Sequence, residues 1–268
     1  MKKNKLALHK NIIKNIYAIS IILNLFIAAS PTFIFWGCAS QHVDQSNPEE
    51  LLKDAEDDIA GKRYLMAIDK LKSIKNKFPY SKLAATAQLR VADCYYLEEL
   101  FIEAAVAYEI FRDLHPKHEQ VDYAIFRIGA SYYNQLPSNV DRDVSMASKA
   151  IEAFEELAKL YPNSQYSAEG RSLLKESFEA LAAKEIYIAD FYYKQDQFSS
   201  ASGRYENVIK QYPQTSYLET AYYGVARSYG KLSDKQDEAT QAYKNYLEKF
   251  PEGKFAKNAE RWLQSKTE

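Results

Sequence analysis

The 268-residue sequence is poor in turn-forming residues. Gly and Pro occur eight times each and make up about 6% of the chain together, roughly half of their usual share in globular proteins. This scarcity excludes collagen-like, linker-rich and turn-dense all-β architectures, and it favours long helices. Hydrophobic residues account for 47% and charged residues for 26% of the sequence, so a folded domain with a substantial core is expected.

Cysteine and histidine are also scarce, which limits the chemistry that the chain can perform. Cys38 and Cys94 are the two cysteines, and they form no CxxC motif, so neither a disulfide framework nor a zinc or redox motif is indicated. His115 and His118 have no third ligand nearby in the sequence, and we expect them to support helix ends and turns rather than a metal.

Motifs for catalysis are missing as well. The sequence has no nucleophile-elbow serine, no phosphate-binding glycine loop and no Cys–His pairing. The paired carboxylates Asp57-Asp58 and Glu155-Glu156 have lysines nearby and are typical of solvated helix faces. We therefore expect no enzyme activity, no metal and no cofactor.

The charge balance argues against binding to nucleic acid. Five of the 35 basic residues lie in the first 37 positions, which contain no acid, so the remainder has 30 basic against 36 acidic residues. A nucleic-acid-binding domain needs a basic face, and a net charge of −6 on the remainder disfavours one.

Residues 1–37 are predicted to be a secretory signal peptide. Five lysines precede a 21-residue apolar run, Ile16 to Trp36, which ends at Gly37-Cys38-Ala39-Ser40. Basic, apolar and small-residue regions in this order are typical of a cleaved signal. The alternative is a transmembrane anchor, because the run is long enough to span a bilayer. Cleavage is preferred, because the run contains Asn and Pro and a polar stretch follows it.

The junction at Cys38 resembles the lipobox, the site at which the signal peptides of bacterial lipoproteins are cleaved. The resemblance implies that Cys38 is diacylated on sulfur, becomes the new N-terminus and is acylated again. Several acyl chains anchor a protein stably where one does not. Residues 38–48 would then be the acylated cysteine and a polar tether, and Ala39 resembles the outer-membrane sorting choice. Cys94 would lack a partner, and we expect it to be a small buried side chain.

The rest of the chain contains one pattern five times. An aromatic residue or His precedes Pro at Phe78-Pro79, His115-Pro116, Tyr161-Pro162, Tyr212-Pro213 and Phe250-Pro251. An alanine stands twelve residues before every one of these prolines, at Ala67, Ala104, Ala150, Ala201 and Ala239. Large apolar or aromatic residues follow four and seven positions after each alanine. This spacing places all three on one face of a helix, which the proline then ends.

A second helix is expected before each of these, marked by its own small residue. The markers are Ala55, Ala92, Gly129, Ala189 and Gly224. A helix–turn–helix unit of about 34 residues with these features resembles the tetratricopeptide repeat. The predicted fold is all-α: a right-handed α-solenoid of five helix pairs within residues 49–268, closed by a C-terminal capping helix at about residues 254–265.

Two segments depart from the regular repeat. The first helix of unit four is extended and is expected to run from about residue 165 to 194. Residues 136–144, with the sequence LPSNVDRDV, are predicted to be a polar loop inserted between the two helices of unit three.

Motifs in and around these segments resemble the BamD family, the tetratricopeptide lipoproteins of the machinery that folds β-barrels into the outer membrane of Gram-negative bacteria. The matching strings are His115-Pro116-x-His118 with Val121-Asp122-Tyr123, Asp141-Arg142-Asp143, Tyr161-Pro162-Asn163-Ser164-x-Tyr166, and Leu181-Ala182-x-x-Glu185-x-Tyr187-x-Ala189 running into Phe191-Tyr192-Tyr193. The resemblance implies a non-catalytic scaffold, anchored by lipid at the periplasmic face of the outer membrane.

The resemblance also implies two binding surfaces. Residues 49–161 would receive the C-terminal segments of unfolded outer-membrane proteins, and residues 162–268 would dock onto the POTRA domain of BamA. Other BAM lipoproteins are further implied partners. In the family an Arg on the second helix of repeat four makes the POTRA contact, and Ala201-x-x-Arg204-x-Glu206 matches its place.

In a tetratricopeptide unit the first helix lines the concave side, and this indicates candidate peptide-binding residues. Tyr96, Tyr133 and Tyr193 follow the core position directly, with Asp93 and Asn134 nearby. Aromatic rings bury apolar side chains of an extended peptide, while carboxylates and amides bond to its backbone. The alternative is that these tyrosines pack against the next repeat.

Two other functions are compatible with a helical solenoid. One is a tetratricopeptide adaptor in envelope integrity or cell division, like the Tol-associated coordinator, but the lipobox and the lack of a coiled-coil segment disfavour it. The other is a helical peptidoglycan hydrolase, which would need a catalytic domain, whereas only 17 residues follow Pro251.

Overall fold

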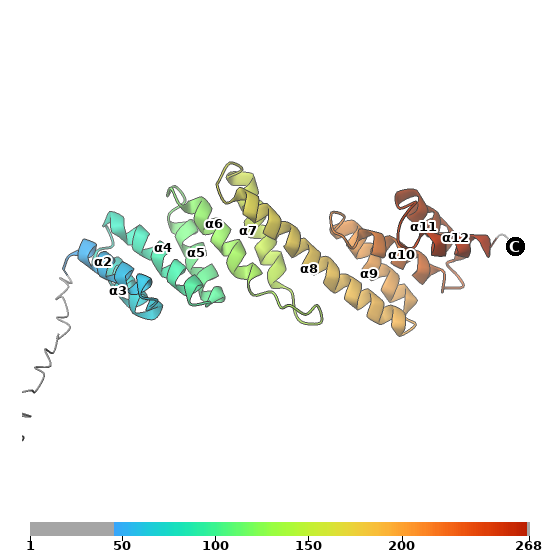
Figure 1. Ribbon diagram of the computed structural model, residues 1–268, viewed down its shortest axis with the longest axis horizontal. Helices are drawn as coiled ribbons and strands as arrows, with labels where there is room; N and C mark the ends of the chain where they lie inside the picture. Colours follow the sequence, from blue (N-terminus) through green and yellow to red (C-terminus); the bar gives the residue numbers. More distant parts are fainter. Residues whose placement is uncertain (1–45, 267–268) are drawn as a thin grey trace, which may run out of the picture. The chain divides into compact units, whose positions relative to one another are not determined.

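The computed structural model describes residues 46–266, which form eleven α-helices and no β-strand (Figure 1). The predicted signal peptide, Cys38 and nearly all of the tether lie outside the described residues. The helices are α2 (Pro48–Ala60), α3 (Tyr64–Lys77), α4 (Lys82–Leu97), α5 (Phe101–Leu114), α6 (Val121–Tyr133), α7 (Met146–Leu160), α8 (Ser167–Lys194), α9 (Phe198–Gln211), α10 (Leu218–Tyr229), α11 (Gln236–Lys249) and α12 (Ala256–Gln264).

Ten of the helices form the five predicted pairs, and α12 packs against α11 as the predicted cap. Each helix from α3 to α11 packs against the helix before it and the helix after it, so that the pairs follow one another in chain order (Figure 1). The tetratricopeptide-type solenoid is therefore confirmed. Each pair buries its apolar face against its neighbours, as expected of a repeat protein.

The Pro motifs end the second helix of every pair. The backbone N–H of the residue before each proline closes the last turn, as in Phe78 to Ile74 O at 2.8 Å and Tyr161 to Leu157 O at 2.9 Å. The following proline has no N–H and cannot extend the ladder. The N-termini of α2 and α4 are capped by side chains. Asn47 Oδ1 accepts from Glu49 N at 3.0 Å, and Ser81 Oγ accepts from Leu83 N at 3.2 Å.

The core includes the predicted alanines and the large residues that follow them. All five alanines of the second helices are fully buried, and so is the aromatic or aliphatic residue seven positions later, apart from 1% exposure at Leu157. Small residues at these crossings let neighbouring helices approach closely. Cys94 is a free, fully buried cysteine, as predicted. Burial, followed by the nearby Asp93 carboxylate, raises the pKa of its thiol to about 12.

The predicted marker of unit five is wrong by two residues. Gly224 packs against Tyr205, which belongs to the preceding pair, whereas Gly129 packs against Phe154 of its own pair. Both α6 and α10 begin five residues after a Pro. Counted from that proline, the position of Gly129 in α6 corresponds to that of Ala226 in α10, which is fully buried. Gly224 is instead the small residue that admits the Tyr205 ring between two pairs.

The two irregular segments are joined to each other. Helix α8 has 28 residues, compared with 13 in α6, and is therefore about 42 Å long. The inserted loop lies between α6 and α7. The Lys184 ammonium of α8 donates to the carbonyl oxygens of Val140, Asp141 and Arg142 at 3.0, 2.9 and 2.9 Å. The long helix thereby fixes the position of the loop.

Candidate binding surfaces

Three of the predicted peptide-binding residues lie close together at the ends of first helices. Tyr96 lies near the end of α4, Tyr133 is the last residue of α6, and Asn134 follows it. The Asn134 side-chain amide donates to the Tyr96 hydroxyl at 2.9 Å, which links the second pair to the third. The Tyr133 hydroxyl donates to Glu176 of α8. Both tyrosine rings are half-buried and Asn134 is exposed.

An arginine covers the ring of Tyr96. The guanidinium carbon of Arg127 on α6 lies 4.4 Å from the Tyr96 ring centroid, and Phe101 packs edge-on against the same ring at 5.3 Å. Tyr193 lies in pair four, with Arg227 of α10 at 4.1 Å and Phe198 edge-on at 5.2 Å. Cation–π contact of this kind is strongest where water is excluded. The two halves of the chain therefore contain the same arrangement of Tyr, Phe and Arg.

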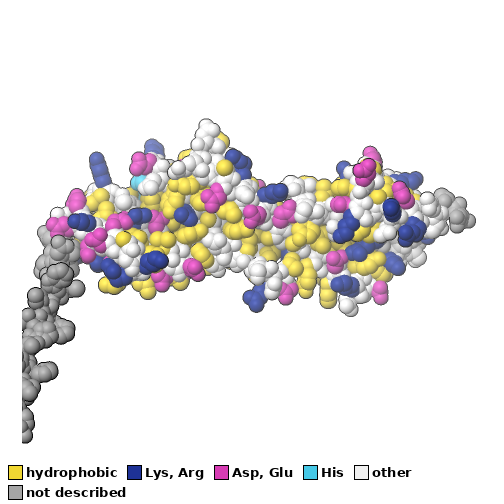
Figure 2. Space-filling view, in the orientation of Figure 1, with side chains coloured by type: hydrophobic (Ala, Val, Ile, Leu, Met, Phe, Trp, Pro, Cys, Tyr) yellow, Lys and Arg dark blue, Asp and Glu magenta, His cyan; other side chains and the backbone are white. Residues whose placement is uncertain are grey.

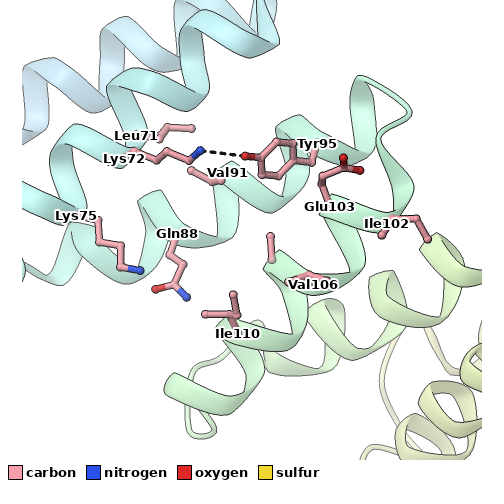
Figure 3. A pocket seen from close by; sticks show the side chains of 11 residues that line it. Leu71, Lys72, Lys75, Gln88, Val91, Tyr95, Ile102, Glu103, Val106 and Ile110 are labelled. Atoms are coloured by element: carbon pink, nitrogen blue, oxygen red, sulfur yellow. Dashed lines mark hydrogen bonds between the residues drawn. The ribbon is translucent and has the colours of Figure 1, made fainter.

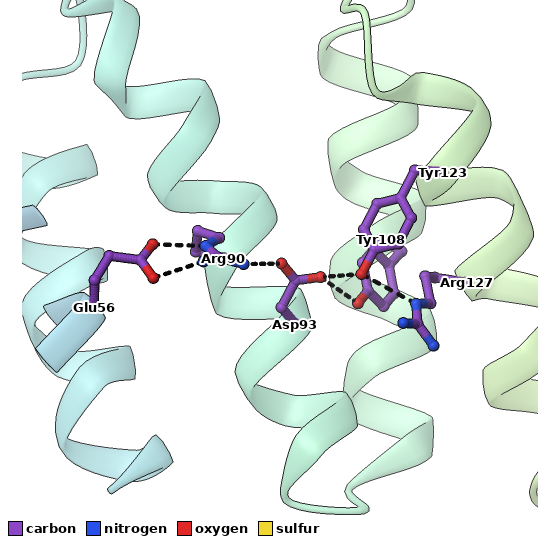
Figure 4. A network of polar contacts seen from close by, with 6 residues as sticks. All are labelled: Glu56, Arg90, Asp93, Tyr108, Tyr123 and Arg127. Atoms are coloured by element: carbon purple, nitrogen blue, oxygen red, sulfur yellow. Dashed lines mark hydrogen bonds and ion pairs between the residues drawn. The ribbon is translucent and has the colours of Figure 1, made fainter. Parts of the chain in front are cut away.

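Asp93 lies beneath the surface rather than on it. Its side chain accepts hydrogen bonds from the hydroxyls of Tyr108 at 2.6 Å and Tyr123 at 2.9 Å, and from Arg90 Nη1 at 3.1 Å (Figure 4). The residue is 7% exposed. Burial and then the Asp93 charge hold the pKa of Tyr108 well above its ordinary value. The carboxylate is therefore engaged by this protein's own side chains.

The network around Asp93 extends across three helix pairs. Arg90 of α4 binds Glu56 of α2 through two bonds of 2.6 Å each, and the Glu56 carboxylate raises the pKa of Arg90. Arg127 Nε donates to the Tyr123 hydroxyl at 3.0 Å (Figure 4). Bidentate Arg–carboxylate pairs constrain the geometry of both partners. The network therefore fixes how the first pair meets the second and how the second meets the third.

A comparable network occurs in the second half of the chain. Asp190 of α8 accepts from the Tyr205 hydroxyl of α9 and from Arg227 Nη2, the latter at 2.5 Å. Sequence reasoning missed Arg90, Arg127 and Arg227. One signal for the first two was available, because Glu56–Arg90 and Asp93–Arg127 are each separated by 34 residues, the length of one repeat.

Arg204 lies on α9, the second helix of pair four, as expected. Its Nη1 lies 3.2 Å from both oxygens of Glu185 on α8, and its side chain is 43% exposed. The Glu185 side chain is 15% exposed, so this ion pair is only partly open to solvent. Arg204 borders an open hollow of about 420 Å³ that is lined by Tyr192, Ser199, Ser200, Gly203 and Asn207. The guanidinium therefore borders a space that a partner's side chain could enter while Glu185 stays paired.

Lys, Arg, Asp and Glu side chains are interspersed on the face seen in Figure 2. Within residues 46–266 no cluster of three or more His, Cys, Asp or Glu is arranged to hold a metal ion. His118 Nδ1 accepts from Gln120 N at 3.1 Å, and both His115 and His118 pack against the Phe111 ring. In the described part of the chain, none of the helices combines the length and apolar character needed to cross a membrane.

Comparison with known proteins identifies the family. The profile of the family described as "YfiO: Outer membrane lipoprotein" matches residues 44–244. The "Outer membrane protein assembly factor BamD" of Neisseria gonorrhoeae is 31% identical over 220 residues, which cover 79% of this chain and 82% of that protein. The protein of the same name from Caulobacter vibrioides is 26% identical over 199 residues, which cover 72% of this chain and 65% of that protein.

Solved structures resemble the chain less closely. The TPR2AB domain of yeast Sti1 in complex with pHSP90 has a TM-score of 0.44 and 15% identity, covering 82% of this chain and 84% of that one. This similarity is too low to add to the fold that the helices establish by themselves. The profile match and the curated relatives, by contrast, span most of the chain, and it belongs to the BamD family of outer membrane protein assembly factors.

Proposed function

We propose that this chain is a non-catalytic scaffold of the machinery that assembles β-barrel proteins in the outer membrane of Gram-negative bacteria. The observation that supports this most strongly is the family match over residues 44–244, together with relatives named as outer membrane protein assembly factors. The fold is compatible with this role, because five helix pairs present side chains over long surfaces without requiring a catalytic centre.

The docking surface that we propose for the POTRA domain of BamA includes Arg204. The guanidinium borders the hollow beside α9, and its ion pair with Glu185 leaves 43% of the Arg204 side chain exposed. A carboxylate of the POTRA domain would share the guanidinium with Glu185, because both contacts of Glu185 are to Nη1 and the guanidinium has further N–H donors. Other BAM lipoproteins are proposed as further partners of the same assembly.

Replacing Arg204 by Glu is expected to weaken binding of purified BamA to the full chain at least tenfold, because attraction to a carboxylate becomes repulsion. The measurement is biolayer interferometry on the two purified proteins. The thermal midpoint should also fall, by about 2–4 °C for each kcal/mol lost, because Glu185 is 15% exposed and loses its counter-charge.

Two further variants separate docking from folding. Glu185→Gln removes the internal partner but leaves the guanidinium free, so it should bind BamA as well as the wild type does. Arg204→Lys keeps the charge but not the planar fork, and an intermediate affinity is expected. Equal binding by the Arg204→Glu variant and the wild type would refute the assignment of Arg204.

The proposed peptide-binding surface consists of Tyr96, Tyr133 and Asn134. The half-buried rings offer apolar contact area, and among residues 46–266 the exposed Asn134 amide bonds only to the Tyr96 hydroxyl. An extended C-terminal segment of an unfolded outer-membrane protein would pack side chains on these rings and bond its backbone to the amide. Tyr193 offers a similar ring in pair four. Asp93 is proposed to support this surface from below by fixing Tyr108 and Tyr123.

The membrane anchor is proposed to be the acylated Cys38. The supporting observation is the Gly37-Cys38 junction at the end of the apolar run. Cys38→Ala is expected to release the protein from the membrane fraction into the soluble periplasmic fraction, because no acyl chain is then attached. The measurement is cell fractionation followed by immunoblotting. Persistence of the variant in the membrane fraction would instead indicate that residues 16–36 remain as an uncleaved anchor.

A further inference from the structure

A groove of about 440 Å³ opens between the second helices of the first two pairs (Figure 3). Helix α3 forms one wall with Lys72 and Lys75, α4 forms the floor with Val91 and Tyr95, and α5 forms the other wall. Both walls are second helices, so this groove is distinct from the surface at the ends of the first helices that was proposed above for peptide binding.

The wall formed by α5 is an exposed apolar strip. Ile102, Val106 and Ile110 follow one another at intervals of four residues, and they are 43%, 46% and 44% exposed. The interval places them on one side of the helix. Single exposed apolar residues are normal, but an apolar strip that borders a groove indicates an interaction site.

The other repeats provide an internal comparison, because two further grooves are built from corresponding positions. The positions of Val106 and Ile110, counted from the buried alanine of each pair, are occupied by Glu152 and Glu156 in the groove between α5 and α7, and by Gln241 and Asn245 in the groove between α9 and α11. Their volumes are about 230 and 290 Å³. The first groove is therefore the largest of the three and the one with apolar residues at both of these positions.

The charge at one position of the opposite wall is also reversed. A tyrosine on the floor of each groove bonds to the residue five positions after the alanine of the preceding pair. This residue is Lys72 for Tyr95, Glu109 for Tyr132 and Glu206 for Tyr229. The position of Lys75 is taken in the second groove by Arg112, whose ion pair with Glu156 at 3.0 Å spans that groove. Ile110 occupies the Glu156 position in the first groove, so Lys75 has no acid opposite it at this position.

We propose that this groove is the docking site for an amphipathic α-helix of a partner protein. The apolar face of that helix would pack on Ile102, Val106 and Ile110, and acidic residues along its flank would meet Lys72 and Lys75. Because Lys72 and Lys75 are basic, the flank of the partner helix that faces them is expected to be acidic. One acidic residue lines this groove, Glu103 on the α5 wall.

A helix fits better than an extended peptide for a simple reason. The walls and floor are helices, whose backbone N–H and C=O groups are bonded within the helices, so they offer no strand edge. An extended peptide would face the apolar wall with unpaired backbone groups, whereas a helix satisfies its own. The strip from Ile102 to Ile110 covers about 12 Å, or about two helical turns, so apolar residues at i, i+3 or i+4, and i+7 of the partner would match it.

The test uses the full chain in nanodiscs of phosphatidylcholine and a fluorescent synthetic helix of 18 residues, with leucines on one face and glutamates on the flank. Fluorescence anisotropy should show binding that weakens at least tenfold when the glutamates are replaced by lysines. The double variant Val106→Glu and Ile110→Glu, which introduces the residues of the second groove, should also weaken binding at least tenfold. Both side chains are exposed, so circular dichroism melting should be unchanged.

Matched variants distinguish this groove from others. Gln241→Glu with Asn245→Glu in the third groove should leave binding unaltered, and Lys72→Glu with Lys75→Glu should reverse the preference toward the lysine peptide. Equal binding by the wild type and the Val106/Ile110 double variant would overturn the proposal. So would loss of peptide binding in nanodiscs of phosphatidylglycerol, because the groove would then be a site for anionic lipid.

Discussion

Replacing Asp93 by Ala is expected to lower the free energy of unfolding by about 3–5 kcal/mol, the cost of breaking a buried ionic network by removing one member. The carboxylate is 7% exposed and accepts from Tyr108, Tyr123 and Arg90 at 2.6, 2.9 and 3.1 Å. Without it the Tyr108 hydroxyl, which is fully buried, loses its acceptor, and Arg90 retains only Glu56.

Urea denaturation followed by circular dichroism measures this change. Asp69→Ala on α3 is the matched control, because Asp69 is exposed, and it should change the unfolding free energy by less than about 0.5 kcal/mol. Asp93→Asn keeps the shape and one acceptor oxygen, so an intermediate loss is expected. A loss below about 1 kcal/mol for Asp93→Ala would show that the network does not hold the first three pairs together.

The second large effect is expected from Gly129→Ala, which should destabilise the protein by about 1–3 kcal/mol, the usual cost of overpacking a core. A Cβ atom at position 129 would lie 2.5–2.8 Å from three ring carbons of Phe154. The Phe154 ring is 1% exposed and packs near Phe126, so it has little room to move. This cost outweighs the gain of about 1 kcal/mol that Ala normally brings to a helix interior.

Gly203→Ala provides a control of opposite sign. Gly203 lies within α9, and a Cβ atom there would meet no atom within 4 Å. The substitution should therefore stabilise the protein by about 0.5–1 kcal/mol through helix propensity alone. The same urea experiments measure both variants. Stabilisation by Gly129→Ala would show that α6 and α7 do not approach as closely as the structure indicates.

The helix pairs could be predicted from the sequence because their markers are local. An alanine twelve residues before a proline specifies a helix, its buried face and its end, and all five such alanines are buried. The extended helix followed from the same count, predicted at about residues 165–194 and found at Ser167–Lys194. Gly224 was misassigned because the position of the small residue was counted backward from Ala239, across a loop of variable length. Counted forward from Pro213, the equivalent position is Ala226.

The binding surfaces were less predictable, because their polar contacts join residues that are far apart in sequence. The proximity of Tyr96 and Asn134 agrees with their expected positions on neighbouring first helices. Asp93 was expected at the surface, but two tyrosines and an arginine from three helices enclose it. The periodicity of an amphipathic helix indicates which face is buried, but it does not specify which carboxylate receives a partner from the next repeat.

The apolar groove was predictable from the sequence only in part. The interval of Ile102, Val106 and Ile110 was present in the sequence, and so were the polar residues at the corresponding positions of the other pairs. The strip alone does not specify a groove, because Lys72 and Lys75 face it from a different helix. A comparison between repeats therefore reveals a surface that each repeat alone does not.

The central claim is that the chain is a scaffold of the outer-membrane assembly machinery, and co-purification tests it most directly. The full chain, carrying an affinity tag at its C-terminus, is isolated from detergent-solubilised outer membranes, and the co-purifying proteins are identified by mass spectrometry. The account predicts recovery of the barrel protein BamA in near-equal amounts. Recovery of Tol components without BamA would contradict it.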